Sequence, residues 1–258
     1  TGDVINMYLD TVQTGGTTPK GFNMSLYMTQ SSCTPTDALD LVHNTQYASV
    51  INYATTQGYT KPSVAQQVAQ NTLVKTLVDA GIWSKLDVFH ITTRGSEEFS
   101  KINWKTPGTA NLTETGTVTW SAGTGFTGNG SGSDDYLSSF DPSTGTWNYT
   151  QNSATFGIWA TADADNNRIV ACSNTSGNRT LMTLSSNSTY RCNSTAATAA
   201  TFNFDGTGFT AINRSSSSDL QTYKNATNAS TTTTSSGVNQ TFTLLRDLSV
   251  GTDSGSSI

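Results

Sequence analysis

The stretch Ser63–Ile91, SVAQQVAQNTLVKTLVDAGIWSKLDVFHI, carries the clearest local pattern in the sequence. Ser63 suits the N-cap of a helix, and Gly81 suits the left-handed position that commonly follows a last helical turn. Between them, apolar residues recur at helical spacing, which predicts one amphipathic helix. The expected apolar face consists of Val64, Val68, Leu73, Val74, Leu77 and Val78, with Gln66, Gln67, Gln70, Lys75 and Asp79 mostly opposite.

The ten residues after Gly81 are crowded with apolar side chains. Segment 82–91, IWSKLDVFHI, contains six large apolar residues, a density typical of a segment buried against another surface. We therefore expect a helical module that attaches the sheet region that follows it, either through its own first strand or to a neighbouring subunit. The residues expected to serve assembly are Val68, Leu77 and Trp83.

The region upstream mixes two patterns. Segments 6–12 and 21–30 alternate in the manner of strands. Segment 35–58, PTDALDLVHNTQYASVINYATTQG, predicts a helix that begins after Thr36 or Asp37 and ends at Gly58.

The region from Ile102 to Leu248 consists of short β-rich runs separated by Gly, Asn, Asp and Ser. Segments such as 154–162 (ATFGIWATA) and 208–215 (GFTAINRS) alternate with a period of two, as half-buried strands do. About ten such strands predict an antiparallel sandwich or jelly roll. The low-complexity segment 227–240 is expected to be a loop or an edge, because its threonines favour extended backbone.

Composition narrows the class of protein. Ser and Thr account for 79 of 258 residues, only 12% of residues are charged, and the net charge is -5. With 34% hydrophobic residues the chain is expected to fold. The 13 basic residues are scattered, which argues against a nucleic-acid partner. No apolar run approaches the ~18 residues of a membrane span, so we expect no membrane insertion.

Cysteine and histidine offer little chemistry. Cys172 and Cys192 flank a plausible hairpin, where a disulfide is one possibility and two free thiols are the favoured one. Cys33 stands alone. Neither the cysteines nor the histidines, His43 and His90, show metal-ligand spacing, so a zinc site is not expected.

Four segments match a known kind of protein when taken as a series in order. They are LVDAGIWSKLD (77–87), INWK (102–105), FTGNG (126–130) and QNSATFGIW (151–159). Over roughly Val50 to Leu245 the chain resembles phage virion proteins in which a short helical module precedes a laminin-G-like or concanavalin-A-like jelly roll. Tail-fibre and head-fibre proteins of phages that infect Bacteroidetes, including crAss-like phages, are similar. Related chains usually continue beyond the equivalent of segment 241–258, so the resemblance implies a sandwich truncated or completed elsewhere.

Hydrolytic chemistry finds little support. Glycan hydrolysis needs two carboxylates that flank the scissile bond, and Glu97, Glu98 and Glu114 are the only glutamates. A solvated turn is the preferred interpretation of the first two, and no nucleophile, base and orienting group can be argued from spacing. We expect no enzyme. Asp134 and Asp135 could ligate Ca²⁺, although an ordinary acidic turn is the commoner arrangement.

Carbohydrate binding is harder to dismiss. Several aromatic residues could stack on a sugar if exposed, although a core role is the commoner one for such residues. Trp147 and Tyr149 lie in a polar turn and are the preferred candidates for exposure, whereas Trp159 alternates with Phe156 and Ile158. The candidate glycan-binding residues are Trp147, Tyr149, Tyr190 and Tyr223.

The sequence therefore predicts a mainly β protein, an antiparallel jelly-roll or concanavalin-A-like sandwich preceded by a small helical module. The expected divisions are an attachment region at 1–57, a helical module and linker at 58–101, and the sandwich at 102–258. The expected function is that of a non-enzymatic structural component on the surface of a phage particle. Its expected partners are other virion proteins, copies of itself (a trimer is favoured) and host-surface glycans. A secreted lectin-like module is the alternative, and a capsid-surface protein that only stabilises the shell is a weaker third option.

Overall fold

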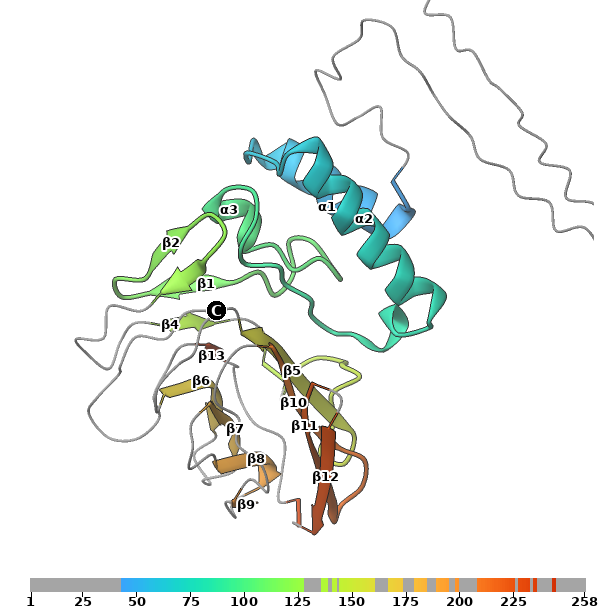
Figure 1. Cartoon of the computed structure of the whole chain (residues 1–258), viewed down its shortest axis with the longest axis vertical. Coiled ribbons are helices and arrows are strands. Elements are labelled where there is room, and N and C mark those ends of the chain that lie inside the picture. The colour runs from blue at the N-terminus through green and yellow to red at the C-terminus, as the bar shows by residue number, and fades with distance from the viewer. Residues whose placement is uncertain are drawn as a thin grey trace, which may run out of the picture. The chain divides into compact units, whose positions relative to one another are not determined.

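The computed structural model describes residues 43–127, 136–138, 141–142, 144–160, 167–173, 179–184, 189–194, 198–199, 208–225, 227–232, 234–235 and 243–244. In these residues antiparallel strands predominate and helices are few, so the chain is mainly β (Figure 1). The expected strands at 6–12 and 21–30 and the expected helix start at Thr36 or Asp37 lie outside the described residues.

The helices lie at the start of the described chain, and local sequence explains their ends. Asn44 caps the first helix by accepting a hydrogen bond from the Tyr47 amide. Ser63 and Gln66 form a reciprocal capping box at the start of the second helix, which confirms Ser63 as its N-cap. The helical elements are α1 (Thr45–Gln57), α2 (Val64–Asp79), the single 3-10 turn η2 (Trp83–Lys85) and α3 (Glu97–Ser100).

The end of α2 is confirmed at Gly81. Gly81 has a φ of 68°, which side chains rarely adopt, and the Ile82 amide donates to the Leu77 carbonyl across it at 2.9 Å. The Gly81 amide donates to the Val78 carbonyl at the same distance. These two bonds form a Schellman motif, which turns the chain sharply into the apolar segment that follows.

The face predicted for α2 is confirmed in part, since Val74 is buried, Leu77 and Val78 pack on the core, and Lys75 and Asp79 are exposed, but other positions are reversed. Gln67 and Gln70 are buried beside Val74, whereas Val68 and Leu73 are 47% and 41% exposed. The glutamines are accommodated by hydrogen bonds: the Tyr47 hydroxyl donates to Gln70 Oε1 at 2.6 Å, and Gln67 Nε2 donates to the Pro62 carbonyl at 2.8 Å. These bonds offset part of the cost of burying the amide-bearing side of the helix, since one atom of each amide is bonded and the other, Gln67 Oε1 or Gln70 Nε2, is buried without a partner.

The helical module has a core of its own, built around Trp104. The Trp104 ring centroid lies 5.4 Å from that of Tyr47, 5.9 Å from that of Phe89 and 6.1 Å from that of Phe99. Residues of α1 and α2 share this cluster, so the expected division at Gln57 separates two helices that pack together. The buried members are Tyr47, Val50, Ile51, Ala54, Val74, Trp83, Phe99, Ile102 and Trp104.

The INWK segment at 102–105 closes this module. Asn103 is fully buried, accepts from the Phe89 and Lys105 amides, and donates to the Thr109 carbonyl at 2.9 Å. Lys105 Nζ donates to the Trp83 carbonyl at 2.6 Å and lies 5.8 Å from the centroid of the Trp83 ring. Ile102 and Trp104 fill the core while Asn103 and Lys105 bond the backbone around it, so each residue of this segment has a structural role.

Within the residues that the structure describes, the strands form three antiparallel sheets (Figure 1). A seven-stranded sheet has the order β1-β4-β13-β6-β7-β8-β9, a four-stranded sheet has the order β12-β11-β10-β5, and β2 pairs with β3. The bounds are β1 (Thr113–Thr115), β2 (Thr119–Ser121), β3 (Gly125–Thr127), β4 (Tyr136–Ser138), β5 (Ala154–Ala160), β6 (Asn167–Ser173), β7 (Arg179–Leu184), β8 (Thr189–Ser194), β9 (Thr198–Ala199), β10 (Gly208–Arg214), β11 (Asp219–Lys224), β12 (Thr227–Thr232) and β13 (Thr243–Leu244).

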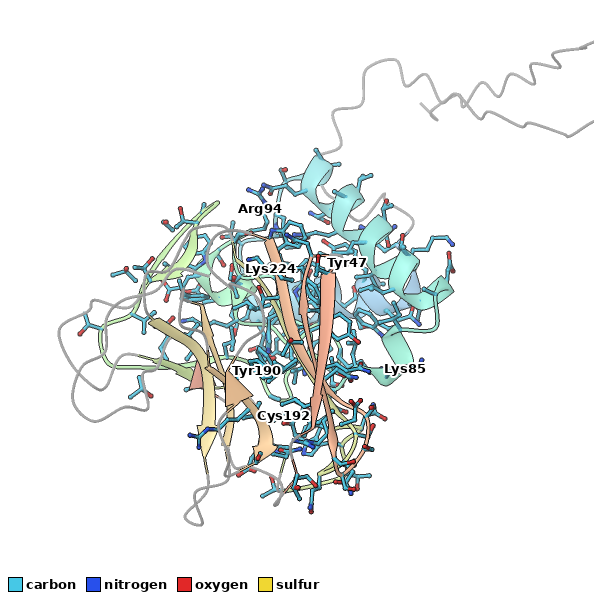
Figure 2. All side chains as sticks on the ribbon, turned by 60° about the horizontal axis from the view of Figure 1, so that its bottom comes forward. Tyr47, Lys85, Arg94, Tyr190, Cys192 and Lys224 are labelled. Carbon is cyan, nitrogen blue, oxygen red and sulfur yellow. The ribbon has the colours of Figure 1, made fainter. Side chains whose placement is uncertain are left out.

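The two larger sheets contribute side chains to one shared core. Tyr190 and Cys192, both labelled in Figure 2, come from β8 of the seven-stranded sheet, and Ile212 and Leu220 come from the four-stranded sheet. All four are fully buried in the same cluster. The remaining buried members are Leu112, Phe126, Leu137, Tyr149 and Ala154.

Two strand-level expectations can be compared with this arrangement. Segment 227–240 was expected to be a loop or an edge, and its first part is β12, the edge strand of the four-stranded sheet. Cys192 is a free buried thiol. Cys172 lies on β6 and Cys192 on β8, with β7 between them, so their backbones are about 10 Å apart, too far for a disulfide.

The helical module is bonded to the chain's own sheet region. The Asp87 carboxylate accepts from the backbone amides of Asn148 and Tyr149, each at 2.8 Å. Trp120 on β2 donates through Nε1 to the Thr92 carbonyl at 2.8 Å. The sequence predicted that the module attaches either to the chain's own sheet region or to a neighbouring subunit. The contacts described here are with the chain's own sheet region.

Candidate binding surface on the four-stranded sheet

The four-stranded sheet buries one face and exposes the other. Strands alternate their side chains between the two faces of a sheet, and on β10 the core side chain Ile212 alternates with Ala211 and Asn213. The register between strands then fixes which residues of β5 and β11 share each face. We call the outward set the aromatic face, and it consists of Thr155, Gly157, Trp159, Phe209, Ala211, Asn213, Gln221 and Tyr223.

Two large aromatic residues on adjacent strands belong to this face. Trp159 on β5 is directly opposite Phe209 on β10 in the antiparallel register. Trp159 is 67% exposed and Phe209 is 38% exposed. Exposing two adjacent large apolar rings is costly in water, and such patches on a protein surface mark contact sites.

Phe209 is held in position by its neighbours. A Cβ placed on Gly157 would lie 3.0 Å from Phe209 Cε2 and Cζ, so the ring covers the glycine on the adjacent strand. The Phe209 amide donates to Asn225 Oδ1 at 3.0 Å, and the Asn225 amide donates back to the Phe209 carbonyl at 2.8 Å. The ring therefore rests on a glycine, and the amide and carbonyl of Phe209 are both bonded to Asn225.

A row of polar groups lies beside the rings. The Thr155 hydroxyl donates to Asn213 Oδ1 at 2.6 Å, and Asn213 Nδ2 donates to Gln221 Oε1 at 3.1 Å. The Tyr223 hydroxyl also donates to Gln221 Oε1, at 2.6 Å. These bonds orient three strands' side chains in one fixed network, and no residue that the structure describes accepts a hydrogen bond from Gln221 Nε2.

Among the described residues, the outward side of the sheet carries no lysine or arginine, and its acidic residue is Asp219, which lies on the same side of β11 four residues before Tyr223. The chain as a whole has a net charge of -5. An acidic ligand is therefore disfavoured, because no described group on this side would pair with a carboxylate, sulfate or phosphate.

The four residues expected to bind glycans are placed differently from one another. Tyr223 belongs to the aromatic face, whereas Tyr149 and Tyr190 are 6% and 0% exposed in the shared core and offer no stacking face. Trp147 is half-buried, and its Nε1 donates to the carbonyls of Asp141 and Thr144. The structure thus does not bring these four together, and it adds Trp159 and Phe209, of which Phe209 was not singled out from the sequence.

Tyr149 is buried for a polar reason. Its hydroxyl is bonded to Thr180 Oγ1 at 2.7 Å and donates to Asn193 Oδ1 at 3.1 Å. Asn193, at a φ of 51°, donates through Nδ2 to the Thr150 and Gln151 carbonyls at 3.0 and 3.1 Å. A tyrosine in a polar turn is therefore drawn inward by partners on β7 and β8 that are distant in sequence.

The three residues expected to serve assembly differ in their exposure to solvent. Val68 is exposed, Leu77 is half-buried, and Trp83 is 7% exposed inside the core of the helical module. Trp83 is accounted for by contacts within the chain, with the ring of Phe89 at a centroid distance of 6.0 Å.

Glu97 and Glu114 meet at Lys101. Lys101 Nζ lies 3.0 Å from Glu97 Oε1 and 2.8 Å from Glu114 Oε1. The hydrogen bond from Lys101 holds the pKa of Glu97 below its ordinary value, whereas burial raises the pKa of Glu114. These ion pairs connect α3 to β1. Because Lys101 lies between the two carboxylates, both glutamates have a structural role.

The metal-site expectation is not addressed by the described residues. Asp134 and Asp135 lie outside them. Among the residues that are described, no group of three or more His, Cys, Asp or Glu side chains is placed to hold a metal ion.

Within the described part of the chain, no helix has both the length and the apolar character needed to cross a membrane. Comparisons with known proteins give no further identification. No family model, no curated protein and no solved structure matches this chain.

Proposed function

We propose that this chain is a non-enzymatic structural component of a phage particle that displays a jelly-roll, concanavalin-A-like domain and contacts host-surface glycans through the aromatic face. The observation that carries the adhesion part is the pair of exposed rings, Trp159 at 67% and Phe209 at 38% exposure, beside an ordered row of amides and hydroxyls. Aromatic faces with a few convergent polar groups are the usual composition of small-molecule sites.

The virion part of the proposal is supported by the sequence resemblance and by the role of its segments. LVDAGIWSKLD contains the Schellman turn at Gly81 and the Asp87 carboxylate that bonds the Asn148 and Tyr149 amides. INWK closes the module core through Asn103 and Lys105. These segments join a helical module to a sheet region, which is the architecture that the resemblance implies.

The same arrangement supports a place on the particle surface and partners among other virion chains. Val68 and Leu73 on α2 remain exposed after the module has packed on its own sheet region. Apolar side chains left in solvent on a helix are suited to contacts with further copies or with other virion proteins, and a trimer is the assembly that we favour.

The experiment that tests the virion role is to locate the chain in particles. Purified phage should yield peptides of this chain by mass spectrometry, and cross-linking should join Lys75, the lysine of α2, to a neighbouring virion protein or to a second copy. Absence of the chain from purified particles would contradict the virion role, whatever the aromatic face binds.

A secreted carbohydrate-binding module without a virion role is the second candidate, and the aromatic face supports it equally. The two differ in assembly. A free module should elute as a stable monomer in gel filtration and bind glycans unaided, whereas a virion subunit should form trimers or require neighbours. A calcium site at Asp134 and Asp135 predicts that a chelator lowers the melting temperature. An unchanged melting curve would show that these two aspartates are not calcium ligands.

A further inference from the structure

We propose that the aromatic face binds a neutral oligosaccharide, with Trp159 and Phe209 as one stacking platform and with Asn213, Gln221 and Tyr223 as the groups that bond sugar hydroxyls. This inference deepens the glycan contact proposed above and rests on it for its biological setting. It names the ligand class and the residues, and it excludes acidic sugars.

Trp159 and Phe209 are opposite one another on adjacent strands, so their Cα atoms are about 5 Å apart and both side chains lie on the outward side of the sheet. A ring face is apolar and flat, which suits the C–H face of a pyranose. Phe209 is already fixed by Gly157 beneath it and by Asn225 beside it, so little side-chain freedom remains to be lost on binding.

The polar row specifies hydroxyl groups. Asn213 and Gln221 are oriented by bonds to Thr155 and Tyr223, which leaves the Gln221 Nε2 group as a donor and the Tyr223 oxygen as an acceptor. A hydroxyl can donate and accept at once, whereas a carboxylate only accepts. A row that presents donors and acceptors together therefore matches a sugar hydroxyl better than an anion.

Charge narrows the ligand further. The aromatic face contains no lysine or arginine, and Asp219 on the same side of β11 would repel an anion. Nucleic acid bases also stack on aromatic rings, but a phosphate backbone needs a basic surface. The overall charge of -5 disfavours that alternative.

Size indicates more than one sugar ring. From Trp159 to Thr155 the face extends four residues along β5, which corresponds to roughly 14 Å at the rise of an antiparallel strand. Trp159 and Phe209 lie at one end of this distance, Asn213 and Gln221 lie at the other, and Tyr223, opposite Ala211, lies between them. A short oligosaccharide can contact both ends, and a single sugar cannot.

The test is affinity electrophoresis of the full chain through gels that contain defined polysaccharides. The neutral gels would hold dextran, mannan, xyloglucan or laminarin, and the acidic gels polygalacturonate or hyaluronan. We expect at least one neutral polysaccharide to slow the wild-type chain, with no loss at raised salt, because screening acts on charges. We expect the acidic gels to leave its mobility unchanged.

Variants assign the residues. Trp159→Ala and Phe209→Ala should each weaken binding by about tenfold or more, the size of a lost stacking contact. Gln221→Ala should weaken it less. Ile82→Ala is the matched control, because Ile82 is exposed to nearly the same extent as Phe209, 43% against 38%, but lies outside the sheet, just before η2. Circular dichroism of each variant shows whether the fold is intact.

Several outcomes would overturn the inference. They are retardation by acidic polysaccharides alone, loss of retardation at raised salt, unchanged binding by a folded Trp159→Ala variant, and no retardation in any neutral gel. A smaller oligomer of Trp159→Ala in light scattering would instead identify the face as a contact between chains and would also overturn it. Recovery of the chain from particles without glycan binding would contradict this inference and the adhesion part of the proposed function but not the virion role. Glycan binding without recovery from particles would contradict only the virion role.

Discussion

The helical module and the four-stranded sheet use the same large aromatic residues in opposite ways. In the module, Trp83 and Trp104 are buried and packed edge-on against neighbouring rings. On the sheet, Trp159 and Phe209 are adjacent and face solvent. The difference shows that residue type does not decide the role of an aromatic side chain, since burial depends on which other elements cover its position.

The largest expected effect on stability comes from removing one of the buried rings of the helical module. Trp104→Ala removes the ring at the centre of the module and should lower the free energy of unfolding by about 3–5 kcal/mol. Urea denaturation followed by circular dichroism measures this. Trp159→Ala is the control, and it should change stability by less than about 1 kcal/mol because its ring is exposed. Equal losses from the two variants would contradict the division between structural and binding aromatics.

The next effect concerns the connection between the two regions. Asp87→Ala leaves the Asn148 and Tyr149 amides without their acceptor and should cost about 2 kcal/mol. We expect the single unfolding transition of the wild-type chain to separate into two in this variant, as seen by calorimetry. Asp79→Ala is the matched control, since Asp79 pairs only with Lys75 on the exposed side of α2 and should have no measurable effect. A single transition in Asp87→Ala would show that the regions are coupled by other contacts.

A smaller effect is expected from pH. Burial lowers the pKa of His90 from 6.5 to about 4, although the ring nitrogen Nδ1 is bonded to the Ile102 carbonyl at 3.0 Å. The unfolded chain binds a proton near pH 6.5 and the folded chain only near pH 4, so stability is full above 6.5 and falls as the pH decreases toward 4. Allowing for the partial exposure of the ring, we expect a loss of about 1 kcal/mol.

Denaturation of the wild-type chain and of His90→Gln across this pH range tests the assignment. The variant should lose most of the slope in this window, and the remainder should include His43, whose pKa is also lowered by burial. An unchanged slope in His90→Gln would assign the acid sensitivity to other groups. A slope lost in His90→Gln concerns the helical module, since no histidine lies in the sheet region.

The smallest effect on stability is expected from a substitution beneath the exposed Phe209 ring. Gly157→Ala places a methyl group 3.0 Å from the Phe209 ring and 3.3 Å from Ala211 Cβ, so the ring must shift. We expect a stability change of less than about 1 kcal/mol and a measurable loss of glycan affinity. In a Phe209→Ala background the same substitution should be neutral, and a double-mutant cycle measures that coupling. Additive losses would show that the ring does not rest on Gly157.

The sequence predicted elements better than it predicted faces. The Ser63 cap, the end of α2 at Gly81 and the strands at 154–162 and 208–215 were all recognisable, because capping and alternation are local properties. The orientation of α2 was not, because it depends on the Tyr47 hydroxyl, which reaches Gln70 from another helix. Hydrophobic periodicity treats a bonded glutamine and a solvated one alike.

The aromatic face could not be predicted from the sequence, because it too depends on contacts between distant segments. Alternation in FGIW places Trp159 opposite in direction to Phe156 and Ile158 but does not say which side is covered. Phe209 joins Trp159 only through the pairing of β5 with β10, fifty residues later. The jelly-roll topology, the virion role and the glycan contact stay proposals that the experiments above address.

The rate at which a thiol reagent labels Cys192 can measure how often the core opens. Cys192 lies fully buried between the two larger sheets, and burial raises its pKa, so a thiol reagent can react only when the sheets separate. In a chain whose other cysteines, Cys33 and Cys172, are replaced by serine, the labelling rate of Cys192 would report the frequency of that separation. Ligand-induced slowing of the reaction would then reveal whether a sugar on the outer surface tightens the interior on which the sheet is built.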